Sequence, residues 1–254
     1  MDLKEEEILG AAVGEHWYYA AKLRAMRRLL AGAPLRRFVD IGAGSGFFAR
    51  RLLAGAGVET AQCIDINYPA ERDEMVDGKP ITFARAARDL PRQDTFLLID
   101  VLEHVDDDTG LLRGFVASAP AGATFLLSVP AFRFLWSRHD VFLEHRRRYR
   151  LAELEAVAQA AGLEVIRGRY FFGLLFPLVA LVRLLRPAGR DAPAQSDLKP
   201  ASPFVNSVLR LVCRIEEVTL LPFNRLLGVT AFCLARKPGV FSDTTESGSA
   251  PRIG

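Results

Sequence analysis

The sequence predicts an α/β fold, in which a mostly parallel sheet of seven strands carries helices on both faces. Short apolar runs of strand length recur along the chain, and segments long enough for a helix or a crossover separate them. Parallel strands need such crossovers and are usually covered on both faces, so this alternation indicates a parallel sheet. The chain has 254 residues, half of them hydrophobic, which is enough for one such domain.

The individual elements follow from apolar periodicity and from the glycines and prolines that end each segment. A first helix is expected over about residues 5–30, before Gly32 and Pro34. The runs predicted as strands are 37–41, 60–66, 81–84, 95–99, 123–129, 163–171 and 228–236. Between them, helices are expected over 47–53, 108–117 and 151–161.

This order of elements predicts four regions. Residues 1–34 form an N-terminal helical region, and residues 35–172 together with 226–238 form the core. Residues 173–225 form a helical insertion between the sixth and seventh strands. The tail 239–254 is rich in Ser, Thr and Gly, and we expect it to be disordered.

A glycine-rich loop after the first predicted strand marks a small-molecule site. Gly42, Gly44 and Gly46 allow a sharp turn and the close approach of a ligand. The second strand ends near Asp65, whose carboxylate can accept hydrogen bonds from ribose hydroxyls. A nicotinamide-binding loop, GxGxxG, would place glycine where this chain has Phe47. A nicotinamide-dependent oxidoreductase and a tight turn without a ligand stay open as alternatives.

Further segments make the pattern specific to one family. They are Glu15-His16-Trp17-Tyr18, Val39-Asp40-Ile41-Gly42-Ala43-Gly44-Ser45-Gly46, Ile64-Asp65-Ile66, Asp100-Val101-Leu102-Glu103-His104-Val105 and Glu144-His145-Arg146-Arg147-Arg148-Tyr149. Over about residues 10–172 and 222–238 the chain resembles class I methyltransferases that use S-adenosylmethionine. Within that class it resembles the bacterial small-molecule enzymes, a group that includes ubiquinone-type O-methyltransferases and enzymes of cell-envelope pathways. This resemblance implies a Rossmann-like sheet with an antiparallel last strand, and S-adenosylhomocysteine as the product.

The resemblance also implies which residues contact the cofactor. The glycine loop would hold the methionine moiety, Asp65 the ribose, and the N-terminal helix would fold over both as a lid. Relatives usually carry an acidic residue for the adenine where this chain has Ala86, so backbone groups near Ala86 and Ala87, or Asp89, would bind adenine instead. The expected cofactor contacts are His16, Trp17, Asp40, Gly42, Ala43, Gly44, Gly46, Asp65, Ile66, Ala86, Asp100, Val101 and Leu102.

Methyl transfer from a sulfonium is an in-line displacement, so the protein mainly aligns donor and acceptor. A hydroxyl acceptor also needs a base, and histidine suits that role near neutral pH. We expect His139 or His145 to be the base, with Tyr149 and Arg147 orienting the acceptor. For the remaining histidines, His16 and His104, we expect a structural or cofactor-contact role.

The arginines of segment 146–150 have two interpretations. They either pair with Glu144, Glu153 and Glu155 on a solvated surface, or contact phosphate or anionic lipid. No extended basic surface with interleaved aromatic residues accompanies them, and the net charge is only +3, so nucleic acid is not an expected partner. The three scattered cysteines form no CxxC pair, and no metal is predicted.

The insertion does not resemble an ordinary soluble crossover. Residues 174–182 are almost wholly apolar, and a second segment, 204–218, has apolar residues at helical spacing. From Arg167 to Arg225 there are nine basic and four acidic residues, a balance of +5. This pattern suits the surface of an anionic membrane, with a helical cap or a dimer interface as the alternatives. Membrane contact would imply a small or lipid-linked acceptor of the methyl group. An inactive membrane adaptor that binds the cofactor stays open as an alternative function.

The acidic run 5–7 near the N-terminus does not resemble a secretory signal peptide. Each cysteine has apolar neighbours in the sequence, so we expect buried, reduced thiols. We therefore expect a cytoplasmic protein with peripheral contact to the inner face of the cytoplasmic membrane.

Overall fold

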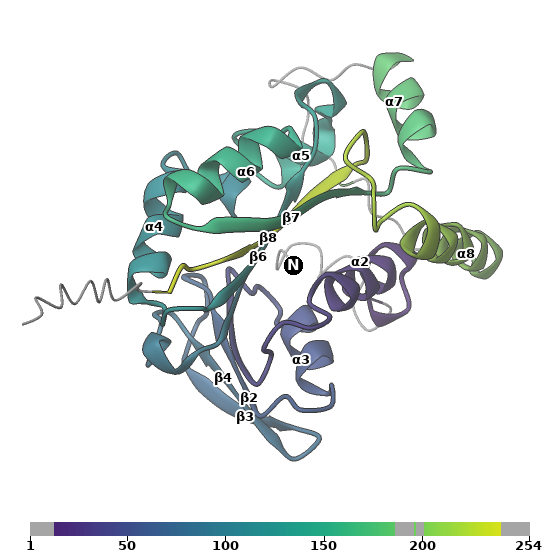
Figure 1. The fold of residues 1–254 in the computed structure, drawn as a ribbon. Helices are drawn as coiled ribbons and strands as arrows, with labels where there is room; N and C mark the ends of the chain where they lie inside the picture. Colours follow the sequence, from purple (N-terminus) through teal and green to yellow (C-terminus); the bar gives the residue numbers. More distant parts are fainter. Residues whose placement is uncertain (1–12, 186–195, 197–200, 240–254) are drawn as a thin grey trace, which may run out of the picture.

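A single eight-stranded sheet organises the chain (Figure 1). The computed structural model describes residues 13–185, 196 and 201–239. The strands are β1 (Arg37–Ile41), β2 (Thr60–Ile64), β3 (Arg72–Val76), β4 (Lys79–Ala84), β5 (Thr95–Ile99), β6 (Thr124–Pro130), β7 (Glu164–Phe171) and β8 (Thr230–Arg236). Their order in the sheet is β3-β4-β2-β1-β5-β6-β8-β7.

The predicted mostly parallel sheet is confirmed. Strands β4, β2, β1, β5 and β6 are paired in parallel, and β8 lies antiparallel between β6 and β7. The chain runs outward from β1 through β2 to β4, then crosses to β5 on the other side of β1. The strand order therefore reverses at β1 and β5, which is where α/β sheets bind their ligands.

The sequence prediction lacked one strand, β3. It pairs antiparallel with β4 at the edge of the sheet, and its residues are charged or partly exposed. An edge strand of this kind needs no apolar run, so periodicity does not reveal it. The hairpin turn does carry a signal, because Asp77 and Gly78 both have positive φ, at 50° and 75°. Asp-Gly is a strong sequence signature of a tight hairpin.

Helices cover both faces of the sheet (Figure 1). One core contains residues of α2 (Trp17–Leu29) and α3 (Phe47–Leu53). The other contains residues of α4 (Asp108–Ser118) and α6 (Leu151–Ala160). A short helix, α5 (Arg138–Phe142), follows β6; it contains His139, one of the two predicted bases, and precedes the segment that contains the other, His145. The helices expected in the core are thus present within two residues of their predicted ends.

The insertion between β7 and β8 contains two helices, α7 (Phe176–Leu185) and α8 (Pro203–Thr219). Figure 1 shows α8 beside α2. The Arg24 guanidinium of α2 donates to Glu217 of α8 at 2.9 Å. Glu216 of α8 is fully buried and accepts the amides of Gly173 and Leu174 at 2.6 and 3.1 Å, which fixes α8 to the end of β7. Of the helices that the structure describes, none is both long and apolar enough to cross a membrane.

Candidate active site

The glycine loop between β1 and α3 has a backbone that only glycine adopts easily. Gly42, Gly44 and Gly46 have φ values of 66°, 53° and 73°. A Cβ on Gly42 would lie 2.6 Å from Val101 Cγ2, and a Cβ on Gly46 would lie 2.6 Å from Phe83 Cε1. The loop is therefore a close-fitting turn at the reversal point of the sheet, and its contact with the methionine end of the cofactor stays a prediction.

Asp65 follows β2 and holds this loop in place. Its carboxylate accepts the amide of Gly44 at 3.0 Å and the amide of Asn67 at 2.9 Å. Each oxygen retains a lone pair for a ribose hydroxyl. Next to it, the Ile66 side chain is 81% exposed, and Ala86, beyond the end of β4, is also exposed. Both expected adenine-side residues thus lie open at the strand ends.

Asp40 lies in β1 just before the glycine loop and is 2% exposed. Burial, with a further contribution from the charge of Asp65, raises the pKa of the Asp40 carboxyl to about 7. Its charge can therefore change near neutral pH, close to where the cofactor's amino acid moiety is expected.

Asp100 directly follows β5, has a positive φ of 56° and joins the N-terminal helix to the sheet. It forms an ion pair with the buried Lys22 of α2 and accepts the Ser128 hydroxyl at 2.8 Å. Burial alone would lower the pKa of Lys22, but the charge and hydrogen bond of Asp100 raise it above the ordinary value. Lys22 was not predicted as a site residue. Its position on the apolar face of a helix was the available signal.

The N-terminal helix begins next to the glycine loop and the insertion. His16 is 6% exposed, and the Trp17 amide donates to Asn206 of α8 at 2.7 Å. The Tyr19 ring lies 5.8 Å from the ring of Phe47, the first residue of α3. The helix thus lies beside α3 and α8, while its role as a lid and direct cofactor contacts of His16 and Trp17 stay predictions.

A pocket of about 660 Å³ lies beyond the ends of β5 and β6. It is lined by Asp106, Arg133, Trp136, Val141, Glu144, His145, Arg146 and Arg147. Of the two candidate bases, only His145 lines it. His139 lies on α5, where its ring stacks on Phe142 at 6.4 Å.

His145 is held by a buried ion pair. Its Nδ1 lies 2.9 Å from Asp140 Oδ1, and the Arg148 guanidinium donates to both Asp140 oxygens at 2.7 and 3.0 Å. Burial opposes ionisation of Asp140, but the hydrogen bond with His145 and the charge of Arg148 hold its pKa well below the usual range. An ionised Asp140 favours the tautomer with a proton on Nδ1, so that Nε2 carries the lone pair.

Two expectations for this segment need correction. Arg148 is not on a solvated surface paired with glutamates, because it is 7% exposed and paired with Asp140. Tyr149 is 3% exposed, and its hydroxyl donates to Asp108 at 2.7 Å, with the carbonyl of Leu102 at 3.0 Å. The buried position of Tyr149 therefore favours a role in holding the loop of Leu102 in place, rather than a role in direct contact with an acceptor.

Arg146 and Arg147 also have aspartate partners. Arg146 pairs with Asp106, and Arg147 donates to Asp108 at 3.1 Å and to the Asp106 carbonyl at 2.8 Å. These bonds connect the loop after α5 to the segment after β5. Both arginines still line the pocket, so they stay candidates for binding an acceptor.

The short 3₁₀ helix Leu102–His104 brings two more groups to this place. Val101 borders the glycine loop, and Leu102 is fully buried. Glu103 is also fully buried, and burial, with the charge of Asp100, raises the pKa of its carboxyl well above the usual range. The His104 ring lies 4.9 Å from the ring of His145. Glu103 was not predicted as a site residue because its burial depends on the fold.

Comparison with known proteins agrees with this geometry. Residues 15–167 match the family profile of a methyltransferase domain. No curated protein matches the sequence. The fold is similar to that of a SAM-dependent methyltransferase from Archaeoglobus fulgidus, with 18% identity, a TM-score of 0.54, and coverage of 92% of this chain and 98% of the other.

A second similar structure is phosphoethanolamine N-methyltransferase 2 of Haemonchus contortus in complex with S-adenosyl-L-methionine. It has 14% identity, a TM-score of 0.52, and coverage of 87% of this chain and 53% of the other. At such identities the two structures support the fold, while the family profile spans more than half of the chain. The family match gives no support to a nicotinamide-dependent enzyme, and the chain belongs to the class I methyltransferases, whose cofactor is S-adenosylmethionine.

Proposed function

We propose that the chain transfers a methyl group from S-adenosylmethionine to a hydroxyl of a small or lipid-linked acceptor, and that His145 accepts the hydroxyl proton. The observation that carries this proposal is the Asp140–His145 pair at the wall of the pocket. A carboxylate on Nδ1 leaves Nε2 basic, which is the arrangement of a general base. His139 lacks a place in the pocket lining and is therefore the weaker candidate.

The division of work among the residues follows from their positions. The bound cofactor would supply a methyl group already activated by its sulfonium. The glycine loop would hold its methionine moiety, Asp65 its ribose hydroxyls, and backbone near Ala86 its adenine. Residues of the pocket would orient the acceptor oxygen, and Nε2 of His145 would take its proton. Alignment of this kind accounts for much of the rate enhancement in two-substrate reactions.

The test compares His145→Ala with His139→Ala. Cofactor affinity is measured by calorimetry, and turnover is measured with radiolabelled cofactor on a panel of phenols with and without a prenyl chain. We expect His145→Ala to lower turnover by about 10²–10⁴-fold with nearly unchanged cofactor affinity, and His139→Ala to change little. Equal turnover in the two variants would exclude His145 as the base. Cofactor binding without transfer to any acceptor would favour the inactive adaptor.

The insertion supports an acceptor that is lipid-linked. The exposed apolar side chains of α7 are Leu178, Leu181, Val182, Leu184 and Leu185, and those of α8 are Phe204, Val205, Val208, Leu211, Ile215 and Val218. Arg210 and Arg214 are also exposed on α8, outside this apolar face. Apolar residues bordered by cations favour the interface of an anionic membrane. The opposite side of α8 contacts the lid helix through Asn206 and Glu217.

Vesicle flotation tests this membrane contact. We expect the protein to bind phosphatidylglycerol vesicles more strongly than phosphatidylcholine vesicles, and the double substitution Leu211→Glu with Ile215→Glu to abolish binding. Met75→Glu is the matched control, because Met75 is an apolar residue with 66% exposure on the edge strand β3. Equal loss in this control, or no binding by the wild type, would refute membrane contact through α8.

A further inference from the structure

Glu103 is a fully buried carboxyl group next to the candidate site. Its side chain is 0% exposed, and both of its oxygens are buried without a hydrogen-bond partner in the described part of the chain. A buried polar group without a partner costs free energy, and a charged group costs more than a neutral one. Such a group calls for an explanation, and a bound cation is one of the few that satisfies both oxygens.

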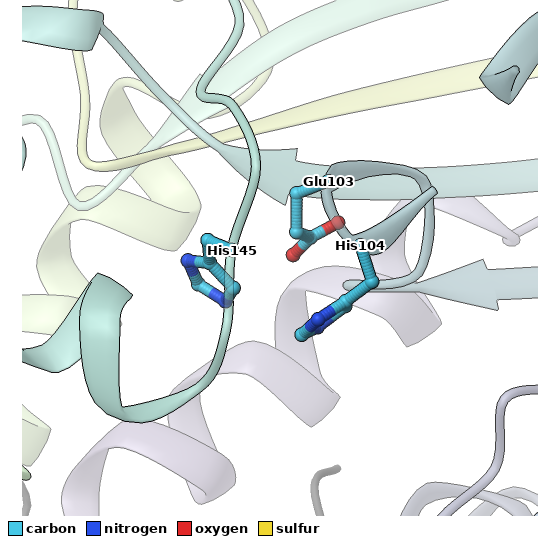
Figure 2. A group of neighbouring side chains, drawn as sticks. All are labelled: Glu103, His104 and His145. Atoms are coloured by element: carbon cyan, nitrogen blue, oxygen red, sulfur yellow. The ribbon is translucent and has the colours of Figure 1, made fainter. Parts of the chain in front are cut away.

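Two imidazoles converge on this carboxyl group. Figure 2 shows Glu103 and His104 on one loop and His145 on the neighbouring segment, with their side chains directed toward a common point. One ligand atom from each of the three residues lies within 4.8 Å of the others. Atoms that each bind one cation at about 2.0–2.2 Å lie up to about 4 Å apart, so a small local adjustment would complete the site.

The support around His145 is that of a metal ligand. Asp140 accepts from its Nδ1 at 2.9 Å, and Arg148 holds Asp140 from the other side. A carboxylate on the second nitrogen fixes the ring of a metal-bound histidine and increases its basicity. The two ligand segments are also joined directly, because the amide of Arg146 donates to the carbonyl of Glu103 at 2.8 Å.

We propose that Glu103, His104 and His145 bind one divalent transition-metal cation, and that this cation binds the acceptor oxygen. One carboxylate and two imidazoles suit zinc, manganese or iron(II), whereas magnesium prefers oxygen ligands alone. His145 lines the pocket, so a cation here would have open positions facing the acceptor. The class of acceptor is then a hydroxyl compound able to coordinate a metal, such as a phenol or a catechol.

This inference rests on the proposed function and changes one step of it. Nε2 of His145 can bind either a proton or a cation, but not both. With the cation bound, the acceptor hydroxyl would coordinate to it, which lowers the pKa of that hydroxyl, and its proton would leave to water. The oxygen would then form its bond to the methyl carbon while the carbon–sulfur bond breaks, with its electron pair remaining on sulfur.

Metal titration of the full chain tests the proposal without an acceptor. Protein freed of metal by chelator and dialysis is titrated with Zn²⁺, Mn²⁺ and Mg²⁺ by calorimetry. We expect one Zn²⁺ or Mn²⁺ per chain and much weaker binding of Mg²⁺. Glu103→Gln and His145→Gln should each weaken binding at least tenfold, and His139→Gln is the matched control that should bind like the wild type. S-adenosylmethionine affinity of every variant checks that it is folded.

Each outcome decides the question. No binding of Zn²⁺ or Mn²⁺, or equal binding by Glu103→Gln, overturns the metal site. Methyl transfer that persists in chelator would overturn it as well and leave His145 as the base. Stoichiometric binding that depends on Glu103 without methyl transfer to any acceptor would uphold the site and count against the proposed function. If the His139→Gln control loses binding equally, the cation binds elsewhere, and the assignment is refuted.

Discussion

Replacing Asp40 by Asn should change how the stability of this protein depends on pH. The carboxyl lies in the central strand β1 with 2% exposure, and its pKa in the folded state is about 7. In the unfolded chain the pKa of an aspartate is about 4. The folded state therefore favours the protonated carboxyl of Asp40. At any pH where this carboxyl is ionised in the unfolded chain, the free energy of unfolding is lower. Asn carries no charge at any pH and removes this dependence.

The sign and size follow from linkage. The stability that a protonated Asp40 contributes is fully present below about pH 4, and it is lost as the pH rises to about 7. Each pH unit in that window is worth about 1.4 kcal/mol, so the whole loss is about 4 kcal/mol, of which about 3 kcal/mol falls above pH 5. Any fixed effect of the amide on packing is the same at every pH and cancels when two pH values are compared.

Urea unfolding without cofactor, from pH 5 to pH 8, measures this difference. The free energy of unfolding of Asp40→Asn relative to the wild type should rise by about 3 kcal/mol across that range. S-adenosylmethionine should reduce the rise, because its cationic amino group would stabilise the ionised carboxylate of the wild type. A relative stability that is constant from pH 5 to pH 8 would show that the Asp40 carboxyl is not perturbed by burial.

Two further predictions concern the backbone and the buried ion pair. Gly46→Ala should lower stability by about 1–2 kcal/mol, because its side chain would lie at positive φ and would collide with Phe83. The same change should weaken cofactor binding in calorimetry. Gly114→Ala is the control at an exposed helical position with open space, and it should raise stability by about 0.5–1 kcal/mol. Asp140→Ala should cost about 3–5 kcal/mol in urea unfolding by leaving Arg148 buried and unpaired, and a second change, Arg148→Met, should recover much of it; no recovery would argue against the pairing.

The sheet and the glycine loop could be predicted because their signals are local. A buried parallel strand such as β5 is a run of apolar residues after Thr95, and a tight turn at positive φ favours glycine. The strand β3 was not predicted because an exposed edge strand needs no apolar pattern. The one local signal of β3 is the Asp77-Gly78 pair, which is typical of a tight hairpin turn.

The site residues could be predicted only as far as local pattern allowed. The sequence predicts His139 or His145 as the base because both follow a strand end in segments that resemble the family, and it does not separate the two. The partner of Lys22 lies 78 residues away in sequence, and only the fold brings the two together. Burial of Glu103 is equally a property of the packed loop. Periodicity depends on residues that are close in sequence. It therefore predicts neither an ion pair between distant segments nor the burial of a loop residue.

The segment from Asp100 to His104 explains how one loop can belong to both halves of the site. Asp100 faces α2, where Lys22 and the Ser128 hydroxyl keep its pKa below the ordinary value against the effect of burial. Three residues later, Glu103 faces His145, and burial with the charge of Asp100 raises the pKa of its carboxyl. Two carboxyl groups pushed apart in this way take different tasks. Asp100 pairs with Lys22 of α2 beside the glycine loop, while Glu103 lies beside the pocket residue His145, so a displacement of this loop should disturb both parts of the candidate site together.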